Sequence, residues 1–244
     1  MGGKDPKTDG RMIVTRHTTL ERLSHYANII FLAFLAMTGF TMYLGLPYLQ
    51  YQDAYRIHII SAAAFLAINW IVTPYAAIAN GRIVEYWFWL SDVRRLLGVL
   101  SNFFTGTEYP RYTIYDERRG KFRNRLHPIT KLLIYLNYTA LLVSTLTGVV
   151  IYSTMLTILG VNISSIVLRV FDFVSPTINM SGFGMARLLH LVAAYWFVIG
   201  TVIHIGVVQL DPKKFEHIKS MFFTGKEDLM VDPTAEIVNP INDD

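Results

Sequence analysis

The chain has 244 residues, of which 52% are hydrophobic and 16% are charged, and its formal net charge is +4. Soluble domains usually carry about 25% charged residues, so this composition excludes an ordinary soluble fold and indicates a membrane protein. The sequence contains no cysteine, which excludes disulfides, thiolate-bound iron–sulfur clusters and thioether-attached haem.

Four apolar stretches are long enough to cross a bilayer, since a spanning helix needs about 20 mostly apolar residues. They are residues 24–46, 56–79, 127–152 and 185–208. Two further stretches, 83–104 and 154–174, mix apolar and charged residues, which is typical of helices that lie at the interface or insert only partly. We therefore expect an all-α membrane protein, with four transmembrane helices in a bundle and short interfacial helices.

The distribution of positive charge predicts the orientation. All but three of the 22 lysines and arginines lie in the segment 1–23, between the second and third spans, or in the tail 210–244. The positive-inside rule then places both termini in the cytoplasm and residues 24–209 in the plasma membrane as the transmembrane domain. Because the basic loop lies between two spans, lipid headgroups or a cytoplasmic partner explain its charge better than nucleic acid does.

Of the seven histidines, His17 and His217 lie in polar flanks, where we expect ordinary surface residues. The other five lie in or at the ends of the spans, and four of them, His25, His58, His190 and His204, sort into two depths. Fourteen residues of helix separate His190 from His204, which corresponds to about 21 Å and brings the second side chain back to nearly the same face. In the predicted orientation, His58 and His190 lie at the outer level, and His25 and His204 lie at the inner level. Each level thus receives one imidazole from each of two helices.

Ionisable residues inside a membrane are costly and usually functional, so these imidazoles need a metal, a proton path or hydrogen-bond partners. A haem iron takes two axial imidazoles from opposite sides, and helix bundles commonly house such cofactors. Zinc would need further Cys, Asp or Glu ligands, which the spans almost lack. We therefore predict two haem b groups, with His58 and His190 on one iron and His25 and His204 on the other.

Two glycines and three arginines extend this candidate site. Gly39 and Gly148 lie near the outer ends of the first and third spans, in a repeated Thr-Gly-x-x-x-Tyr pattern. A macrocycle needs small residues where it meets a backbone, although helix packing explains such residues equally well. Arg56 and Arg187 at the outer level and Arg22 at the inner level are candidates to pair with haem propionates, the alternative being cations that extend to the interface.

The segment "RLSHYANIIFLAFLAMTGFTMY" resembles the first span of the cytochrome b subunits of membrane-bound nickel–iron hydrogenases and respiratory formate dehydrogenases. That family has an Arg, then a His followed by an aromatic residue, then Thr-Gly, which here are Arg22, His25-Tyr26 and Thr38-Gly39. The segments "LLVSTLTGVVIY" and "ARLLHLVAAYWFVIGTVIHI" resemble the third and fourth spans.

The resemblance covers roughly residues 15–215 and implies two b-type haems, with a quinone or similar lipophilic carrier near the inner one. It also implies two partners, an iron–sulfur subunit and a catalytic dehydrogenase subunit outside the cytoplasm. Before the third span, the formate dehydrogenase branch often has an Asn where this chain has His127. A histidine there could bond a quinone and pass it a proton, or it could simply precede the helix that starts at Pro128.

The sequence thus predicts a dihaem cytochrome b subunit that anchors a respiratory dehydrogenase and passes electrons across the membrane to a quinone-like carrier. Catalysis would belong to the partner, and this chain would contribute at most the site where the carrier is reduced. One alternative is another type of transmembrane b-haem carrier, which usually has paired histidines on two helices. The other is a membrane anchor or transporter with a histidine proton relay, which predicts acidic partners within the spans.

Overall fold

Four long helices dominate the computed structural model, which describes residues 7–8 and 11–240. Within this part of the chain, the helices able to cross a membrane are α1 (Thr19–Leu44), α2 to α3 (Tyr51–Ala79), α5 (Pro128–Tyr152) and α7 (Gly182–Leu210). They match the four predicted spans to within a few residues at each end, so the expected helical membrane architecture is confirmed. The start of the segment 1–23 and the end of the tail 210–244 lie outside the described residues.

Local sequence explains where α1 begins and ends. Thr18 and Glu21 form a capping box, in which each side chain accepts a hydrogen bond from the other residue's backbone N–H, at 3.3 Å and 2.7 Å. This satisfies two of the backbone donors that a helix start leaves without partners. The helix ends at Gly45, which adopts the left-handed conformation that glycine reaches most easily.

The second span contains a π-helical turn. It consists of α2 (Tyr51–Ala67), the turn η1 (Ile68–Val72) and α3 (Thr73–Ala79). Pro74 near the start of α3 has no backbone N–H, and its ring would clash with the carbonyl oxygen four residues earlier in a regular α-helix. The wider turn directly before this proline relieves that conflict, as π-helical turns do where a helix is interrupted.

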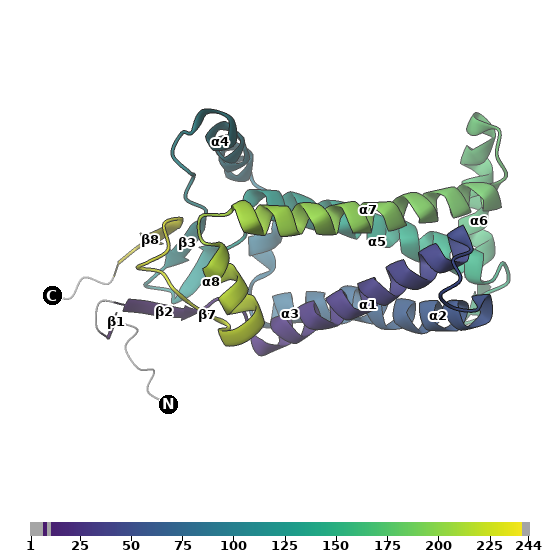
Figure 1. Ribbon diagram of the computed structural model, residues 1–244, viewed down its shortest axis with the longest axis horizontal. Helices are drawn as coiled ribbons and strands as arrows, with labels where there is room; N and C mark the ends of the chain where they lie inside the picture. The colour runs from purple at the N-terminus through teal and green to yellow at the C-terminus, as the bar shows by residue number, and fades with distance from the viewer. Residues whose placement is uncertain (1–6, 9–10, 241–244) are drawn as a thin grey trace. The chain divides into compact units, whose positions relative to one another are not determined.

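The chain divides into two compact units, and each is described by itself. The first comprises residues 1–132 and 205–244, and the second comprises residues 133–204. In the first unit, α1 and the second span run side by side in opposite directions (Figure 1). In the second unit, α5 and α7 contact each other through side chains, and the short α6 (Ile163–Val174) lies in the connection between them.

The first unit also contains two small sheets, which the sequence analysis did not predict. In one, β2 (Arg11–Thr15) pairs antiparallel with β1 (Lys7–Thr8) and β7 (Lys226–Asp228). In the other, β3 (Thr113–Asp116) pairs antiparallel with β4 (Lys121–Asn124) and parallel with β8 (Ala235–Val238). We call the part of the chain built on these strands the sheet domain.

A small apolar core holds the sheet domain together. Its buried members are Met12, Val14, Tyr115 and Leu229. Because side chains alternate along a strand, Met12 and Val14 of β2 point to the same side, into this core. The N-terminal segment, the loop between the second and third spans and the tail therefore fold together.

The two stretches expected at the interface form short helices. In α4 (Leu90–Thr105), exposed apolar residues recur at helical spacing, while Asp92 on the opposite side is fully buried. The exposed apolar residues are Leu90, Val93, Leu97, Leu100 and Phe104. The second stretch forms the hairpin of β5 (Thr157–Ile158) and β6 (Val161–Asn162), followed by α6. With 12 residues, α6 is about 18 Å long, which is too short to cross a bilayer.

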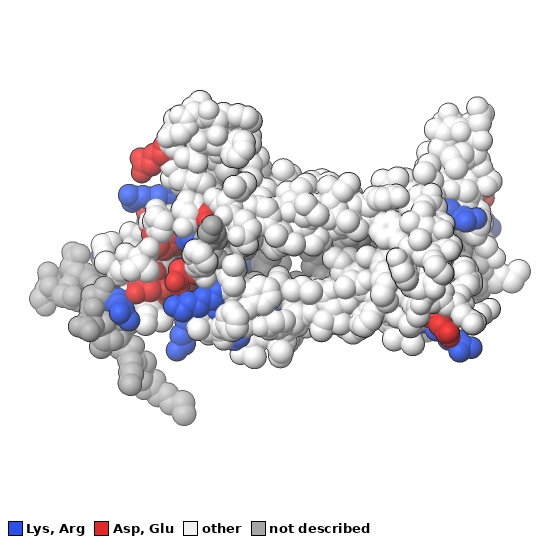
Figure 2. Space-filling model, viewed as in Figure 1, with Lys and Arg blue, Asp and Glu red and all other residues white. Residues whose placement is uncertain are grey.

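Charged side chains avoid the middle of the long helices. On the face shown in Figure 2, lysine, arginine, aspartate and glutamate gather at the helix ends, and the stretches between them carry none. An apolar belt of this kind is what a helix presents to the hydrocarbon core of a bilayer.

Candidate functional site

The histidine of the second span, His58, lies against a Thr-Gly pair of the first span. Its Nδ1 atom is 3.0 Å from Oγ1 of Thr38, which is completely buried. A Cβ atom added to Gly39 would lie 3.3 Å from Cε1 of His58. The missing side chain at Gly39 therefore allows the imidazole ring to lie close to the backbone of α1.

The hydrogen bonds of Thr38 determine which nitrogen of His58 carries the proton. The threonine hydroxyl donates its single proton to the carbonyl oxygen of Phe34, at 2.6 Å. Its oxygen therefore accepts a hydrogen bond from Nδ1–H of the histidine. The neutral ring then has its lone pair on Nε2, which is the form in which histidine binds a metal ion.

The second unit repeats this arrangement around His190 of α7. Its Nδ1 atom is 2.9 Å from Oγ1 of Thr147 on α5, and that hydroxyl donates to the carbonyl oxygen of Val143 at 2.6 Å. A Cβ atom on Gly148 would lie 3.5 Å from Cε1 of His190. We call each arrangement of threonine, glycine and histidine a Thr-Gly seat.

His25 lies near the start of α1, where the C-terminal part of the chain packs against that helix. Its ring meets the ring of Phe222 edge to face, with 5.4 Å between centroids. The neighbouring Tyr26 donates a hydrogen bond to the carbonyl oxygen of Phe222, at 2.5 Å. Phe222 belongs to the π-helical turn η4 (Lys219–Thr224), so this turn is part of the surroundings of His25.

Within each unit the histidines lie at two heights along the helices. Thr38 marks the level of His58 and lies 13 residues after His25 on the continuous helix α1, which corresponds to about 20 Å. His190 and the half-buried His204 are 14 residues apart on α7, which corresponds to about 21 Å. Because His25 and His58 belong to one unit and the other two to the second, their pairing on shared irons stays a prediction.

The three arginines predicted to pair with propionates have different surroundings. Arg22 donates hydrogen bonds to the carbonyl oxygens of residues 221–223, at distances from 2.7 to 3.2 Å. Carbonyls at the end of a helix carry partial negative charge, so this contact fastens η4 to α1. Arg56 and Arg187 are exposed near the ends of their helices. The propionate role stays a prediction for all three.

His127 directly precedes α5 and is buried, with 5% of its surface exposed. Its Nδ1 atom accepts a hydrogen bond from the backbone N–H of Ile129 at 3.1 Å, so Nε2 carries the proton and donates to the Tyr109 hydroxyl at 2.8 Å. Burial lowers the pKa of His127 to about 4, although the charge of Asp211 acts in the opposite direction. These contacts make His127 a cap of α5, and its predicted quinone role stays a prediction.

Buried ion pairs connect the parts of the sheet domain, and the sequence analysis missed them. Glu227 of β7 is bonded by Arg16, at 2.5 Å, and by Lys213, at 3.0 Å. Lys213 also bonds Asp232 and donates to the Thr113 hydroxyl at 2.7 Å. All four charged side chains are less than 10% exposed, so they form a desolvated network in which each charge has a partner.

A second group of ion pairs is built around Arg125. Its guanidinium bonds Glu85 and Glu21, both at 2.6 Å, and Arg82 bonds Glu21 at 2.8 Å. The charge of Glu85 and that of Glu21 raise the pKa of Arg125 against the effect of burial. Together the two groups contain four cations and four carboxylates, and two of the cations, Arg82 and Arg125, belong to the basic loop.

Two histidines expected at the surface prove to be part of these networks. Nδ1 of His17 lies 3.1 Å from the guanidinium of Arg125, and Nε2 of His217 lies 3.1 Å from the hydroxyl of Tyr112. Burial lowers the pKa of both histidines, most strongly for His17. The expectation that they are ordinary surface residues was wrong, because single polar residues in a charged segment carry no pattern that reveals burial.

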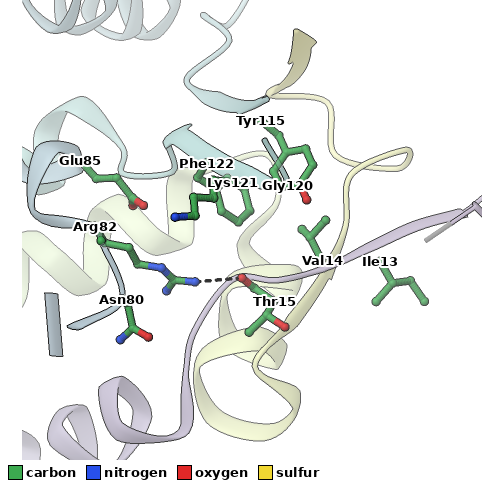
Figure 3. A pocket seen from close by; sticks show the side chains of 11 residues that line it. Ile13, Val14, Thr15, Asn80, Arg82, Glu85, Tyr115, Gly120, Lys121 and Phe122 are labelled. Atoms are coloured by element: carbon green, nitrogen blue, oxygen red, sulfur yellow. Dashed lines mark hydrogen bonds between the residues drawn. The ribbon is translucent and has the colours of Figure 1, made fainter. Parts of the chain in front are cut away.

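A pocket of about 410 Å³ opens beside this network (Figure 3). It is lined by residues of β2, β3 and β4 and by the turn after α3. In the figure Arg82 reaches across to the carbonyl oxygen of Thr15, at 3.2 Å. None of the four histidines of the spans lines this pocket, so it belongs to the sheet domain and not to the candidate site.

Two amide contacts inside the spans were also missed by the sequence analysis. In the first unit, Asn28 and Asn69 exchange hydrogen bonds at 2.7 and 3.3 Å, and Asn69 belongs to the π-helical turn of the second span. In the second unit, Trp196 donates to Asn137 at 3.0 Å. The sequence contains a signal for these contacts, because an amide in an otherwise apolar span needs a hydrogen-bond partner.

The residues present fit a b-type haem. The described parts of the spans offer imidazole nitrogens as iron ligands, and two of these imidazoles are held with Nδ1 protonated and the lone pair on Nε2. A Cβ atom added at Gly39 or Gly148 would contact the edge of the histidine ring. A noncovalently bound haem needs this donor set and no cysteine.

Comparisons with known proteins agree with this geometry. A family model described as prokaryotic cytochrome b561 matches residues 16–224. The chain is also 34% identical over 234 residues to the F420 non-reducing hydrogenase II cytochrome subunit of Methanosarcina mazei, covering 92% of this chain and 86% of the relative. No solved structure matches. The predicted resemblance to hydrogenase cytochrome b subunits is thus confirmed, and the chain belongs to the prokaryotic cytochrome b561 family of membrane-integral, haem b-binding proteins.

Proposed function

We propose that this chain is the dihaem membrane subunit of a hydrogenase-type complex and passes electrons across the membrane to a quinone-like carrier. The observation that carries the proposal is the pair of Thr-Gly seats, one in each unit, each presenting an imidazole with its lone pair on Nε2. The relative from Methanosarcina mazei, which is by its name the cytochrome subunit of a hydrogenase, supports the choice of complex.

Two pairs of histidines would hold the cofactors. We assign His58 and His190 to the outer haem, and His25 and His204 to the inner haem, with both termini in the cytoplasm. The roughly 20 Å between the two levels within each unit supports this assignment. Bound haem would supply a one-electron site at each level, while the chain holds the ligands and keeps water away from them.

The arginines would neutralise the propionates. For the outer haem we propose Arg56 and Arg187, which are exposed and lie two and three residues before the outer histidines. Arg22 precedes His25 by three residues in the same way, but its guanidinium already bonds three backbone carbonyls. A propionate there would use the remaining N–H groups of a side chain that has five donors.

Electrons would enter from an iron–sulfur subunit at the outer level, and that subunit would link the chain to the catalytic subunit. A carrier of single electrons suits such a partner, because iron–sulfur clusters also change by one electron. We place reduction of the carrier at the inner level, where His127 and Tyr109 form a polar pair next to the start of α5. The carrier would bond Nε2–H of His127 in place of the tyrosine hydroxyl.

The haem content of the purified full-length chain tests the main proposal. We expect b-type bands in the reduced spectrum and two haems per chain. His190→Leu should remove one haem, whereas Thr201→Val on the same helix should keep both. Absence of haem would refute the cytochrome reading, and one haem per chain in the wild type would refute the two-level assignment.

Reduction of the carrier requires a separate experiment, since the haems can bind without it. We expect His127→Asn and Tyr109→Phe to keep two haems and to slow oxidation of the reduced chain by a water-soluble quinone analogue. Ser101→Ala, on the exposed side of α4, serves as the control. Unchanged oxidation rates in both variants would remove His127 from the carrier site and leave the haem assignment intact.

A further inference from the structure

The two Thr-Gly seats are alike in detail although they lie in different units. In each, a fully buried threonine on one helix faces Nδ1 of a histidine on the next long helix, at 3.0 Å for Thr38 and 2.9 Å for Thr147. Each hydroxyl donates to the carbonyl oxygen four residues earlier, at 2.6 Å in both cases. The repeated Thr-Gly pattern of the sequence therefore has a use that goes beyond close helix packing.

The seats fix both the protonation and the position of the ring. Because the hydroxyl proton is committed to a backbone carbonyl, the threonine oxygen can only accept from Nδ1–H. That donation also polarises the hydroxyl and makes its oxygen a better acceptor. A Cβ atom added to the glycine beside each threonine would lie 3.3 Å from the ring at Gly39 and 3.5 Å at Gly148, so the missing side chain lets the ring edge approach the helix backbone.

A hydrogen bond at the remote nitrogen changes how strongly an imidazole donates to a metal. When Nδ1–H donates to an acceptor, the ring becomes more basic at Nε2, and a stronger donor stabilises the oxidised metal more than the reduced metal. A neutral hydroxyl has a smaller effect than a carboxylate would. Two such hydrogen bonds, one on each outer histidine, would both lower the reduction potential of the iron.

We infer that Thr38 and Thr147 are positioning residues which hold His58 and His190 as Nδ1–H tautomers and lower the reduction potential of the outer haem. The inference rests on the proposed assignment of these histidines to one haem. The chain thereby sets the potential of this haem with two side chains that do not contact the iron.

The test is a redox titration of the purified full-length chain, followed by its absorption spectrum. Thr38→Val and Thr147→Val keep the shape of the side chain and remove the hydroxyl acceptor. We expect each to keep two haems and to shift the outer potential upward, with a larger shift in the double variant. The electron paramagnetic resonance g-values of the outer haem should change as well, while those of the inner haem stay the same.

Matched controls separate the hydrogen bond from general packing. Thr41→Val on α1 and Thr139→Val on α5 each remove a hydroxyl that also bonds the carbonyl four residues earlier, but neither hydroxyl is bonded to His58 or His190. Neither control should shift a potential. Thr38→Ser and Thr147→Ser keep the hydroxyl and should restore the wild-type potential and g-values.

The possible results decide between the inference and the assignment beneath it. Unchanged potentials and g-values in a double valine variant that keeps two haems would overturn the inference and leave the proposed function standing. If valine removes the outer haem, the serine variants decide: recovery of the haem supports the hydrogen bond, and continued loss refutes it. A wild-type chain without two haems would instead refute the proposed function.

Discussion

The Tyr109 hydroxyl lies 2.8 Å from Nε2 of His127, while Nδ1 of the same ring caps the first turn of α5. This histidine is therefore held neutral on both sides, consistent with its low pKa of about 4. Its position at the junction between the sheet domain and a membrane span makes its titration visible in the stability of the chain.

The pH dependence of unfolding should report this histidine. Because its pKa falls from 6.5 in the unfolded chain to about 4 in the folded one, stability is full above pH 6.5 and decreases as the pH falls towards 4. A pKa shift of this size corresponds to about 3 kcal/mol in the free energy of unfolding. His127→Asn keeps a capping acceptor and removes the titration, so its unfolding midpoint should fall less steeply between pH 6.5 and 4. Equal slopes in thermal unfolding of both proteins would contradict the prediction.

Replacing Gly39 should be worse than replacing Gly148. The added Cβ of Gly39→Ala would lie 3.3 Å from the ring of His58, which is tight, whereas that of Gly148→Ala would lie 3.5 Å from His190, which is ordinary contact. We expect lower content of the outer haem or altered g-values in the first variant and near wild-type behaviour in the second. Gly206→Ala on α7 meets no atom within 4 Å and is the control. Equal behaviour of all three would contradict this order.

The amide pair in the first unit should behave as a coupled pair. Asn28→Leu or Asn69→Leu alone removes the hydrogen bonds between the two amides inside the spans, and each should destabilise the chain by about 1 kcal/mol. The double variant removes both polar groups and should cost less than the sum of the two single changes. A double-mutant cycle on unfolding in detergent measures this coupling, and strict additivity would argue against it.

Arg22→Gln distinguishes a structural arginine from one that binds a propionate. Loss of three hydrogen bonds to residues 221–223 should release η4 from α1 and increase proteolytic cleavage there. Arg94→Gln on the exposed side of α4 should leave cleavage unchanged. If the variant also shifts the potential of the inner haem, the propionate role gains support. A shifted potential without increased cleavage would contradict the structural role.

Glu227→Gln should destabilise the sheet domain more than a substitution of any exposed residue. The carboxylate is shared by two buried cations, Arg16 and Lys213, and removing its charge leaves them undercompensated. Breaking a buried pair in this way typically costs about 3–5 kcal/mol. Proteolysis of the tail and thermal unfolding provide the measurement, with Glu236→Gln, an exposed residue of β8, as the control. A melting temperature equal to that of the control would refute the importance of the network.

The spans and the histidine levels could be predicted because their signals are local. Hydrophobic stretches define the four helices, and a fixed rise per residue places His190 and His204 at two levels whatever the rest of the chain does. Gly39 and Gly148 were also identified, but their prediction concerned a macrocycle, and the structure shows that both meet the edge of a histidine ring.

The sheet domain could not be predicted because its order depends on contacts between distant segments. Its strands have two to five residues, too few for a clear alternation, and β3 pairs in parallel with β8 from the far end of the chain. Charged residues such as Glu227 and Lys213 look solvent-exposed in the sequence. Only the fold shows that their partners come from other segments. The π-helical turn before Pro74 could not be predicted either, because a proline alone permits several kinds of kink.

The ion pair between Arg16 and Glu227 joins a residue that is synthesised early to one that is synthesised late. In the predicted orientation, Arg16 would be a positive charge without a carboxylate from the tail when the first span enters the membrane, and it would contribute to the signal that orients that span. Only after the fourth span has been inserted does Glu227 become available on the same side. The same cation would then serve twice, first in orienting the first span and later in the ion pair with Glu227, which forms only after every span has been inserted.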